Sequence, residues 1–159
     1  MIVKPQTIWR ICRECYAADA FSGEGARRFG GRWNSRGVPM IYASTSLALA
    51  AIELFVHLEP NLAPQDLVSI AAELPEDEPG VRWDLAVLPP VWWGDEPGPM
   101  HELGDAWIRD KQNLAVFVPS VPIRLEWNVL INPLHPRIGE VRVQTVAPFA
   151  FDARMFTRL

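Results

Sequence analysis

The sequence has 159 residues, the size of one ordinary domain, and is long enough to form a hydrophobic core without disulfides or a metal. Its composition, 49% hydrophobic and 21% charged, is typical of a soluble globular protein. The formal net charge of -4 argues against a general nucleic-acid-binding protein, because such proteins need excess positive charge against phosphates. Any anion site must therefore be local.

The N-terminal residues contain no unbroken apolar stretch of the kind that a signal peptide has, and no apolar run approaches the roughly 20 residues that cross a bilayer. We therefore expect a cytoplasmic protein that does not insert into a membrane. No linker or repeat divides the sequence, so we expect one domain over residues 1–159.

Apolar periodicity and turn-forming residues predict the following elements in chain order. They are a strand at 7–12, an irregular glycine-rich segment at 21–37, a strand at 39–44, a helix at 46–58, strands at 67–74 and 81–85, a proline-rich loop at 88–99, a helix at 100–112, and strands at 114–118, 123–131 and 140–148. Because strands cluster late and only two helices are expected, an α+β fold or a mixed, β-sandwich-like core fits better than regular βαβ alternation. Neither a G-x-G-x-x-G after a strand nor a phosphate-loop lysine motif is present, which argues against the usual dinucleotide and triphosphate folds.

Glu53 is the unusual residue of the helix at 46–58, where almost every other residue is apolar. A helix that is apolar all round is normally buried, so we expect this one in the interior. A carboxylate removed from water must be paired, protonated or directed into a cavity. One alternative is a buried ion pair with an arginine. Another is a metal site with His57 one turn on, although these two side chains alone do not fill a coordination shell.

Arginine is far more frequent than lysine in this sequence, with 13 Arg against 2 Lys. The planar fork of arginine suits phosphate groups, whereas lysine would serve equally well as a solubilising charge. The glycine-rich segment carries four arginines and no acidic residue between Gly25 and Arg36; they are Arg27, Arg28, Arg32 and Arg36. Arg32 follows two glycines and precedes a tryptophan, which indicates a tightly placed backbone and a local anion pocket. The other three are expected to be ordinary surface charges.

Tyr42 and Ser120 are further candidates. On a strand at 39–44, Tyr42 would be delivered close to the start of the helix that carries Glu53, where its ring could stack on a planar ligand or lie in the core. Ser120 lies between prolines in a fixed turn, which suits hydrogen-bond donation better than nucleophilic attack. The pair Cys12 and Cys15 lacks a second ligand pair for zinc, so we expect two buried or half-buried thiols in a reducing compartment.

Taken together, these residues resemble the RES domain family, which is named for an arginine, a glutamate and a serine. The matching pieces keep their order over nearly the whole chain: WR at 9–10, GGRWN at 30–34, IYAS at 41–44, Glu53, PSV at 119–121, NVLINPLHP at 128–136 and FAFDARMF at 149–156. The resemblance implies that Arg32, Tyr42 and Glu53 are the central active-site residues. It also implies that Arg10, Asn34 and Ser120 contribute to ligand binding.

The resemblance further implies an ADP-ribosyltransferase-like mixed sheet core with few helices. It implies that the protein is the toxin of a toxin–antitoxin pair and that this toxin degrades NAD at the nicotinamide–ribose bond, by phosphorolysis or hydrolysis. NAD would be the substrate and inorganic phosphate a possible co-substrate, with no prosthetic group and no metal. The implied partner is an Xre-like helix-turn-helix antitoxin, in a complex that contains a toxin homodimer. The alternatives are ADP-ribosylation of a protein target and a non-catalytic module that binds a nucleotide or a protein partner.

Overall fold

The computed structural model describes residues 6–156, which fold around one seven-stranded sheet in the order β4-β5-β6-β2-β1-β3-β7. The strands are β1 (Thr7–Arg13), β2 (Ile41–Ser44), β3 (Leu67–Glu73), β4 (Val81–Arg82), β5 (Ala115–Pro119), β6 (Trp127–Ile131) and β7 (Arg142–Phe149). The α-helices of the described range are α1 (Glu24–Phe29), α2 (Leu47–Phe55) and α3 (Gly98–Asp110). Short 3-10 helices lie at Glu14–Asp19, Ile138–Glu140 and Ala153–Met155.

This architecture confirms the predicted α+β class with a mixed sheet core and few helices, and it excludes a two-sheet sandwich, since all seven strands belong to one sheet. The β4–β5 pair is parallel, whereas the other neighbours pair antiparallel. Single-domain organisation over residues 1–159 stays a prediction, because residues 1–5 and 157–159 lie outside the described range. Within that range, no helix is long and apolar enough to cross a membrane.

Several element boundaries differ from the prediction. The glycine-rich segment contains α1, which is bounded by Gly23 and Gly30 with φ of 74° and 73°. The predicted strand at 123–131 starts only at Trp127, because the preceding residues form a turn that is closed by a hydrogen bond from the Ser120 amide to the Glu126 carbonyl. The predicted strand at 81–85 is reduced to the two residues of β4.

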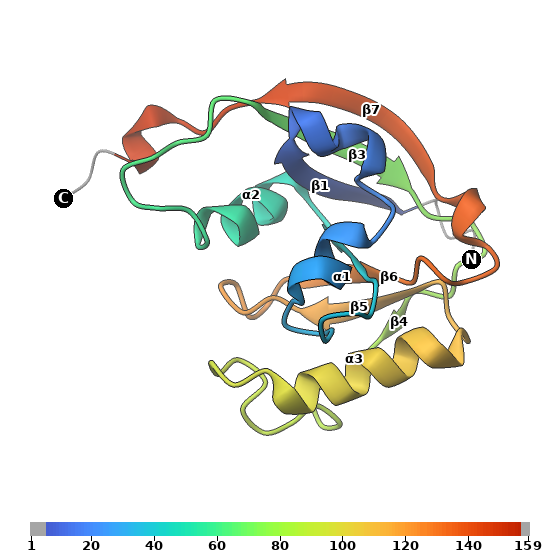
Figure 1. The fold of residues 1–159 in the computed structure, drawn as a ribbon. Helices are drawn as coiled ribbons and strands as arrows, with labels where there is room; N and C mark the ends of the chain where they lie inside the picture. Colours follow the sequence, from blue (N-terminus) through green and yellow to red (C-terminus); the bar gives the residue numbers. More distant parts are fainter. Residues whose placement is uncertain (1–5, 157–159) are drawn as a thin grey trace.

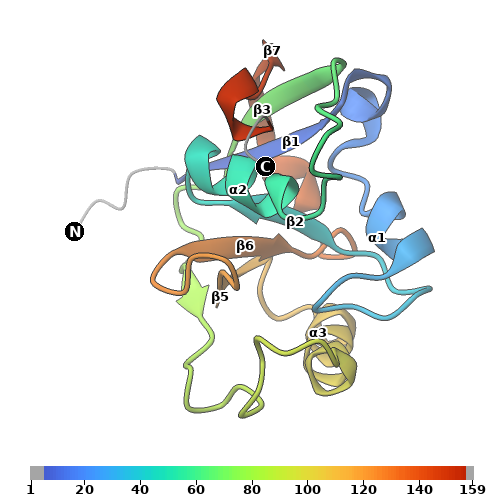
Figure 2. The same cartoon turned by 90° about the vertical axis from the view of Figure 1, so that its left-hand side faces the viewer.

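The sheet is nearly divided between β1 and β2. These strands share a single register pair, Trp9 with Ser44, whereas β1 and β3 share seven pairs and β2 and β6 share four. The β1-β3-β7 part therefore diverges from the β2-β6-β5-β4 part, as Figures 1 and 2 show from two directions. Arg10 bridges the division, since its Nη1 donates a hydrogen bond of 3.0 Å to the Tyr42 carbonyl.

Alternation along β2, β5 and β6 sends side chains into two separate hydrophobic clusters, one on each face of the sheet. Helix α3 covers one of these faces with Met100, Trp107 and Ile108, and Figure 1 shows it running alongside the β4-β5 end of the sheet. Tyr42 packs against the cluster under α3. Because residues two apart along a strand share a face, Ser44 lies on the same face as Tyr42, and so does Asn128, which is opposite Ser44 in the register.

Helix α2 begins as predicted, because the Ser46 hydroxyl caps it by accepting a hydrogen bond of 3.1 Å from the Leu49 amide. The expectation that this helix is buried all round was wrong. Only Leu49 and Ala50 are fully buried, and its outer side is covered incompletely by a C-terminal aromatic group in which Phe55 contacts Phe151 and Phe156. An apolar helix can thus lie at the edge of a fold when a later segment shields part of it.

Candidate active site

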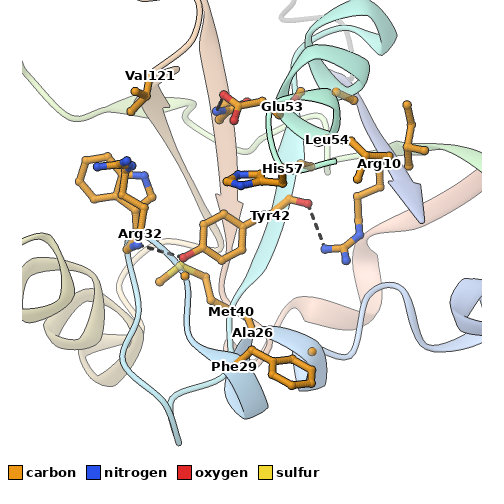
Figure 3. A pocket seen from close by; sticks show the side chains of 18 of the residues that line it. Arg10, Ala26, Phe29, Arg32, Met40, Tyr42, Glu53, Leu54, His57 and Val121 are labelled. Atoms are coloured by element: carbon orange, nitrogen blue, oxygen red, sulfur yellow. Dashed lines mark hydrogen bonds between the residues drawn. The ribbon is translucent and has the colours of Figure 1, made fainter. Parts of the chain in front are cut away.

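A cavity of about 730 Å³ opens where the two parts of the sheet diverge. This is a size at which small-molecule ligands are commonly bound. Its walls come from β1, the glycine-rich segment, β2, α2 and the loops that follow α2 and β5. Four of the predicted site residues line it: Arg10, Arg32, Tyr42 and Glu53 (Figure 3). The fold therefore brings together residues that are distant in the sequence, from Arg10 on β1 to Glu53 on α2.

The Glu53 carboxylate is held by neutral donors. Ser120 Oγ donates a hydrogen bond of 2.7 Å to Glu53 Oε1, and Asn128 Nδ2 donates one of 2.5 Å to the same oxygen. Among the described residues, Glu53 forms no ion pair, and its second oxygen, Oε2, accepts no hydrogen bond. The alternative of a buried ion pair with an arginine is therefore wrong. One carboxylate oxygen is anchored to the protein and the other is free for a ligand.

Arg10 is a buried cation without a carboxylate partner in the described part of the chain. Its Nη1 binds the Tyr42 carbonyl, while its buried Nε has no hydrogen-bond partner there. Burial lowers the pKa of the Arg10 guanidinium from its usual range, because desolvation disfavours the charged form. A buried donor without a partner is rare and costly, and the Arg10 guanidinium lines the cavity without a carboxylate beside it, which is a local indication of an anionic ligand.

Arg32 is oriented by backbone carbonyls on the far side of the cavity. Its Nη1 donates hydrogen bonds of 2.9 and 2.8 Å to the carbonyl oxygens of Trp92 and Gly94. Carbonyl groups fix the direction of a guanidinium without cancelling its charge. Arg32 therefore keeps its positive charge and further donors for a ligand.

One face of α3 holds the segment that carries Arg32. His101 Nε2 lies 2.6 Å from the Gly31 carbonyl, and the Asp105 carboxylate accepts a hydrogen bond of 2.9 Å from the Ser35 amide. Between them Gly104 lies directly against the Trp33 carbonyl, which leaves no space for a Cβ atom. The tightly placed backbone predicted around Arg32 is thus present, and its cause is close packing against α3.

The Tyr42 ring is fixed through its hydroxyl. This hydroxyl donates a hydrogen bond of 2.6 Å to Asn34 Oδ1 and accepts one of 3.0 Å from the Trp33 amide. Burial raises the pKa of Tyr42 above its ordinary value, so the phenol stays protonated and acts as the donor in the first of these bonds. Gly31 packs against the ring, because a Cβ at this position would come within 2.5 Å of the Tyr42 hydroxyl. In Figure 3 the ring lies between Arg32 and Arg10.

Two other predicted site residues do not line the cavity. Asn34 is fully buried, and its Nδ2 donates to the carbonyls of Ala26, Ser35 and Val38 while its Oδ1 receives the Tyr42 hydroxyl. The structure therefore places Asn34 behind Tyr42, at a distance from any ligand, where it supports the ring. Ser120 is also fully buried. Its Oγ accepts from the Ile123 amide and donates to Glu53, which agrees with the prediction of a fixed donor in a turn.

The prediction missed three polar residues around Glu53. His57 and Asn128 line the cavity, and Ser44 lies beside Asn128 in the β2–β6 register. Asn128 and Ser44 were both inside matched motifs, but their contacts depend on strand register. The contact between Asn128 and Glu53 spans 75 residues of sequence, and the contact between Ser44 and Asn128 spans 84. His57 was considered only as a metal ligand. No group of three or more potential metal-binding side chains gathers within residues 6–156.

Arg27 and Arg28 agree with the interpretation as surface charges, whereas the expectation of two buried or half-buried thiols was wrong for Cys15, which is exposed. Arg27 and Arg28 both pair with Glu24 on α1, and their hydrogen bonds lower the pKa of that carboxyl to about 2. Cys12 is half-buried and Cys15 is exposed, and both are free thiols. Burial raises the pKa of the Cys12 thiol, so this residue is poorly suited to a reactive thiolate.

The fold and the cavity define an α+β protein with one mixed seven-stranded sheet, few helices and a cavity in which Arg10 and Arg32 lie with the oriented carboxylate of Glu53. Comparison with known proteins agrees with this class. The model of the RES domain family matches residues 7–153, and the chain belongs to the RES domain family.

Curated relatives match this chain over almost its whole length. A protein of Sphingobium sp. (strain YBL2) named "Prs ADP-ribosylating toxin" is 35% identical, with 96% of this chain and 98% of the relative covered. A "Toxin Res" of Pseudomonas putida is also 35% identical, with 94% and 99% covered. Among solved structures, a chain of the M. tuberculosis MbcT–MbcA toxin–antitoxin complex has a TM-score of 0.70 at 20% identity, with 94% of this chain and 86% of that chain covered. This last similarity supports the fold.

Proposed function

We propose that the protein is the toxin of a toxin–antitoxin pair and that it consumes NAD by cleaving the nicotinamide–ribose bond. The observation that carries this proposal is the environment of Glu53, whose Oε1 is anchored by two neutral donors while Oε2 accepts no hydrogen bond. The same cavity is lined by Arg10 and Arg32, which have no carboxylate partner among the described residues. The names of the curated relatives, which are toxins, support the same class.

In this proposal the bond between the ribose C1 carbon and the nicotinamide nitrogen breaks first. Its electron pair leaves with the nitrogen, so neutral nicotinamide departs and the ribose becomes oxocarbenium-like. Oε2 of Glu53 stabilises the developing positive charge and accepts a hydrogen bond from a ribose hydroxyl. A phosphate oxygen or a water oxygen then bonds to the anomeric carbon. In the case of water, the surplus proton passes to solvent.

The cationic side chains bind the diphosphate. Arg10 and Arg32 supply the guanidinium donors that the backbone carbonyls leave free, since guanidinium groups match phosphate oxygens in charge and geometry. The ring of Tyr42, fixed from behind by Asn34, orients the nicotinamide end by stacking. Ser120 does not act as a nucleophile, because its single hydroxyl proton is donated to Glu53 and its oxygen accepts from the Ile123 amide.

The decisive experiment incubates the purified protein, freed of any copurified partner, with NAD in the presence and absence of inorganic phosphate. Mass spectrometry then identifies the products. ADP-ribose-1-phosphate that forms only with phosphate indicates phosphorolysis, and ADP-ribose in both conditions indicates hydrolysis. Nicotinamide release in neither condition would contradict NAD cleavage and would leave a module that binds a nucleotide without turnover.

A second candidate reaction is ADP-ribosylation of a protein. The name of the Sphingobium relative, an ADP-ribosylating toxin, favours this reaction. Cleavage of the nicotinamide–ribose bond is the first step of both NAD degradation and ADP-ribosylation. The product analysis separates the two reactions: addition of host-cell lysate and ADP-ribose detection on protein bands would reveal a transfer acceptor. Transfer without free ADP-ribose or its phosphate would make the acceptor a protein.

The proposal includes an antitoxin partner, because the structural neighbour belongs to a toxin–antitoxin complex. From the family resemblance we propose an Xre-like helix-turn-helix antitoxin and a toxin homodimer in the complex. Co-expression of the adjacent gene, followed by light scattering on the purified complex, tests both points. A complex with one toxin chain would refute the dimer.

A further inference from the structure

We propose that Asn128 is a positioning residue for Glu53 and that Ser44 orients the Asn128 amide, so that a chain of side chains from Ser44 through Asn128 aims the free carboxylate oxygen into the cavity. This inference rests on the proposed NAD cleavage for its kinetic test, although its structural test does not depend on it. Ser44 and Asn128, which position the Glu53 carboxylate, are both neutral.

The polarity of the chain is determined by its two ends. A carboxylate can only accept, so the Asn128 amide must present its Nδ2 to Glu53, at 2.5 Å. The Asn128 Oδ1 then faces Ser44, whose Oγ donates a hydrogen bond of 2.7 Å. Ser44 thus donates to Asn128 and Asn128 donates to Glu53, whereas the reversed amide would direct an oxygen at the carboxylate.

The backbone makes this chain rigid. Asn128 lies on β6 between β2, where it is opposite Ser44, and β5, where it is opposite Val118. The Ser44 side chain is 3% exposed, so water does not compete readily for its hydroxyl. By contrast, Glu53 projects from a helix that is only partly buried and would otherwise be free to rotate. A residue on a central strand therefore determines where a residue on a peripheral helix points.

Two donors on one oxygen have a chemical consequence. Ser120 and Asn128 both bind Oε1 and stabilise the ionised carboxylate, while Oε2 is left to meet the ribose. Loss of Asn128 lets the carboxylate rotate about its last torsion and removes one charge-assisted hydrogen bond. Removal of one such bond lowers turnover by roughly 10- to 100-fold when the bond is needed in the transition state.

The test compares four folded variants with the wild type in NAD turnover: Asn128→Ala, Asn128→Asp, Ser44→Ala and Thr45→Val. Thr45 is the matched control, because its Oγ1 also bonds across the β2–β6 pair, to the Trp127 carbonyl at 3.0 Å, without reaching Glu53. We expect kcat to fall roughly 10- to 100-fold in Asn128→Ala with KM little changed, to fall less in Ser44→Ala, and to stay within about twofold in Thr45→Val.

Asn128→Asp gives a readout that a purely structural role would not change. Two carboxylates at hydrogen-bond distance cannot both ionise readily, so the acid limb of the kcat–pH profile should move to higher pH. Wild-type kcat in folded Asn128→Ala would overturn the proposal. Equal losses in Asn128→Ala and Thr45→Val would also overturn it, because they would show a general effect on the strand pair.

A spectroscopic measurement separates this inference from the proposed function. In ¹H–¹⁵N spectra, the Asn128 side-chain amide should change position in Ser44→Ala and in Glu53→Gln but stay in place in Thr45→Val. If the wild type cleaves no NAD but the amide responds in this way, the proposed function fails and the positioning chain stands. An amide that does not respond to Glu53→Gln refutes the chain, whatever the activity.

Discussion

Replacement of Glu53 by glutamine separates the charge of this residue from its structural contacts. The glutamine Oε1 can accept the same hydrogen bonds from Ser120 and Asn128, and its amide nitrogen would occupy the place of Oε2 beside the cavity. Shape and anchoring are therefore kept, while the negative charge that faces the ribose is lost. An oriented group of this kind contributes about 2.7 kcal/mol or more to transition-state stabilisation. We expect NAD turnover to fall by roughly 100-fold or more.

Stability should change little in the same variant. Glu53 has no ion-pair partner among the described residues, so the substitution leaves no buried charge uncompensated. A change below about 1 kcal/mol corresponds to a shift in Tm of less than about 4 °C for a chain of this size. Circular dichroism melting and nicotinamide release, both measured on the same preparation, test the two expectations together.

The matched control is Glu59→Gln, which removes the same charge from an exposed residue shortly after α2 that does not line the cavity. It should retain full turnover. Wild-type turnover in folded Glu53→Gln would refute the assignment of Glu53. A large fall in Tm with proportionate loss of activity would instead show that the carboxylate has a structural role.

Three further substitutions test other parts of the site and fold. Arg10→Gln should raise KM for NAD roughly 10- to 100-fold, because a phosphate loses a charged donor, while Tm should fall by only about 2–4 °C, since the Tyr42 carbonyl loses one hydrogen bond but no protein carboxylate loses a partner; an unchanged KM would contradict phosphate binding by Arg10. Gly31→Ala should displace the Tyr42 ring, lower the free energy of unfolding by about 1–3 kcal/mol in urea denaturation and reduce turnover, whereas Gly25→Ala, at an open position, should do neither. Burial raises the pKa of Glu78, so the protonated side chain is favoured in the folded protein. The contribution of Glu78 to stability is therefore complete below its unfolded-state pKa and is lost as pH rises through its folded-state pKa. Glu78→Gln should be more stable than the wild type near neutral pH but not in acid, as a series of Tm measurements against pH would show.

The sequence was a good guide to elements whose pattern is local. The strands β1, β3 and β5 and the start of helix α2 could be predicted because alternation and helical periodicity involve neighbouring residues. Helix α1 was missed because its flanking glycines are typical of irregular segments. Its signal was the placement of Glu24 three and four residues before Arg27 and Arg28, which is the spacing of salt bridges on a helix.

The site was predictable only in part, for a related reason. Arg32, Tyr42 and Glu53 are unusual in their own surroundings, so they could be singled out from the sequence. Asn128 is an ordinary polar residue on a strand, and only its register opposite Ser44 gives it a role. Asn34 was predicted to contribute to ligand binding but lies buried behind Tyr42, because a motif identifies a residue as part of a site without showing which way its side chain points.

Two groups of arginines among the described residues differ in what holds their guanidinium groups. Those in the first group pair with carboxylates at the surface, where exposed pairs contribute little to stability and leave little net charge for a ligand; they are Arg13, Arg27, Arg28, Arg137 and Arg154. Arg10 and Arg32 line the cavity and are held instead by backbone carbonyls. A carbonyl orients a guanidinium but does not neutralise it. In the proposed reaction, these two guanidinium groups bind the phosphates of NAD, and Glu53 is the carboxylate that faces the sugar.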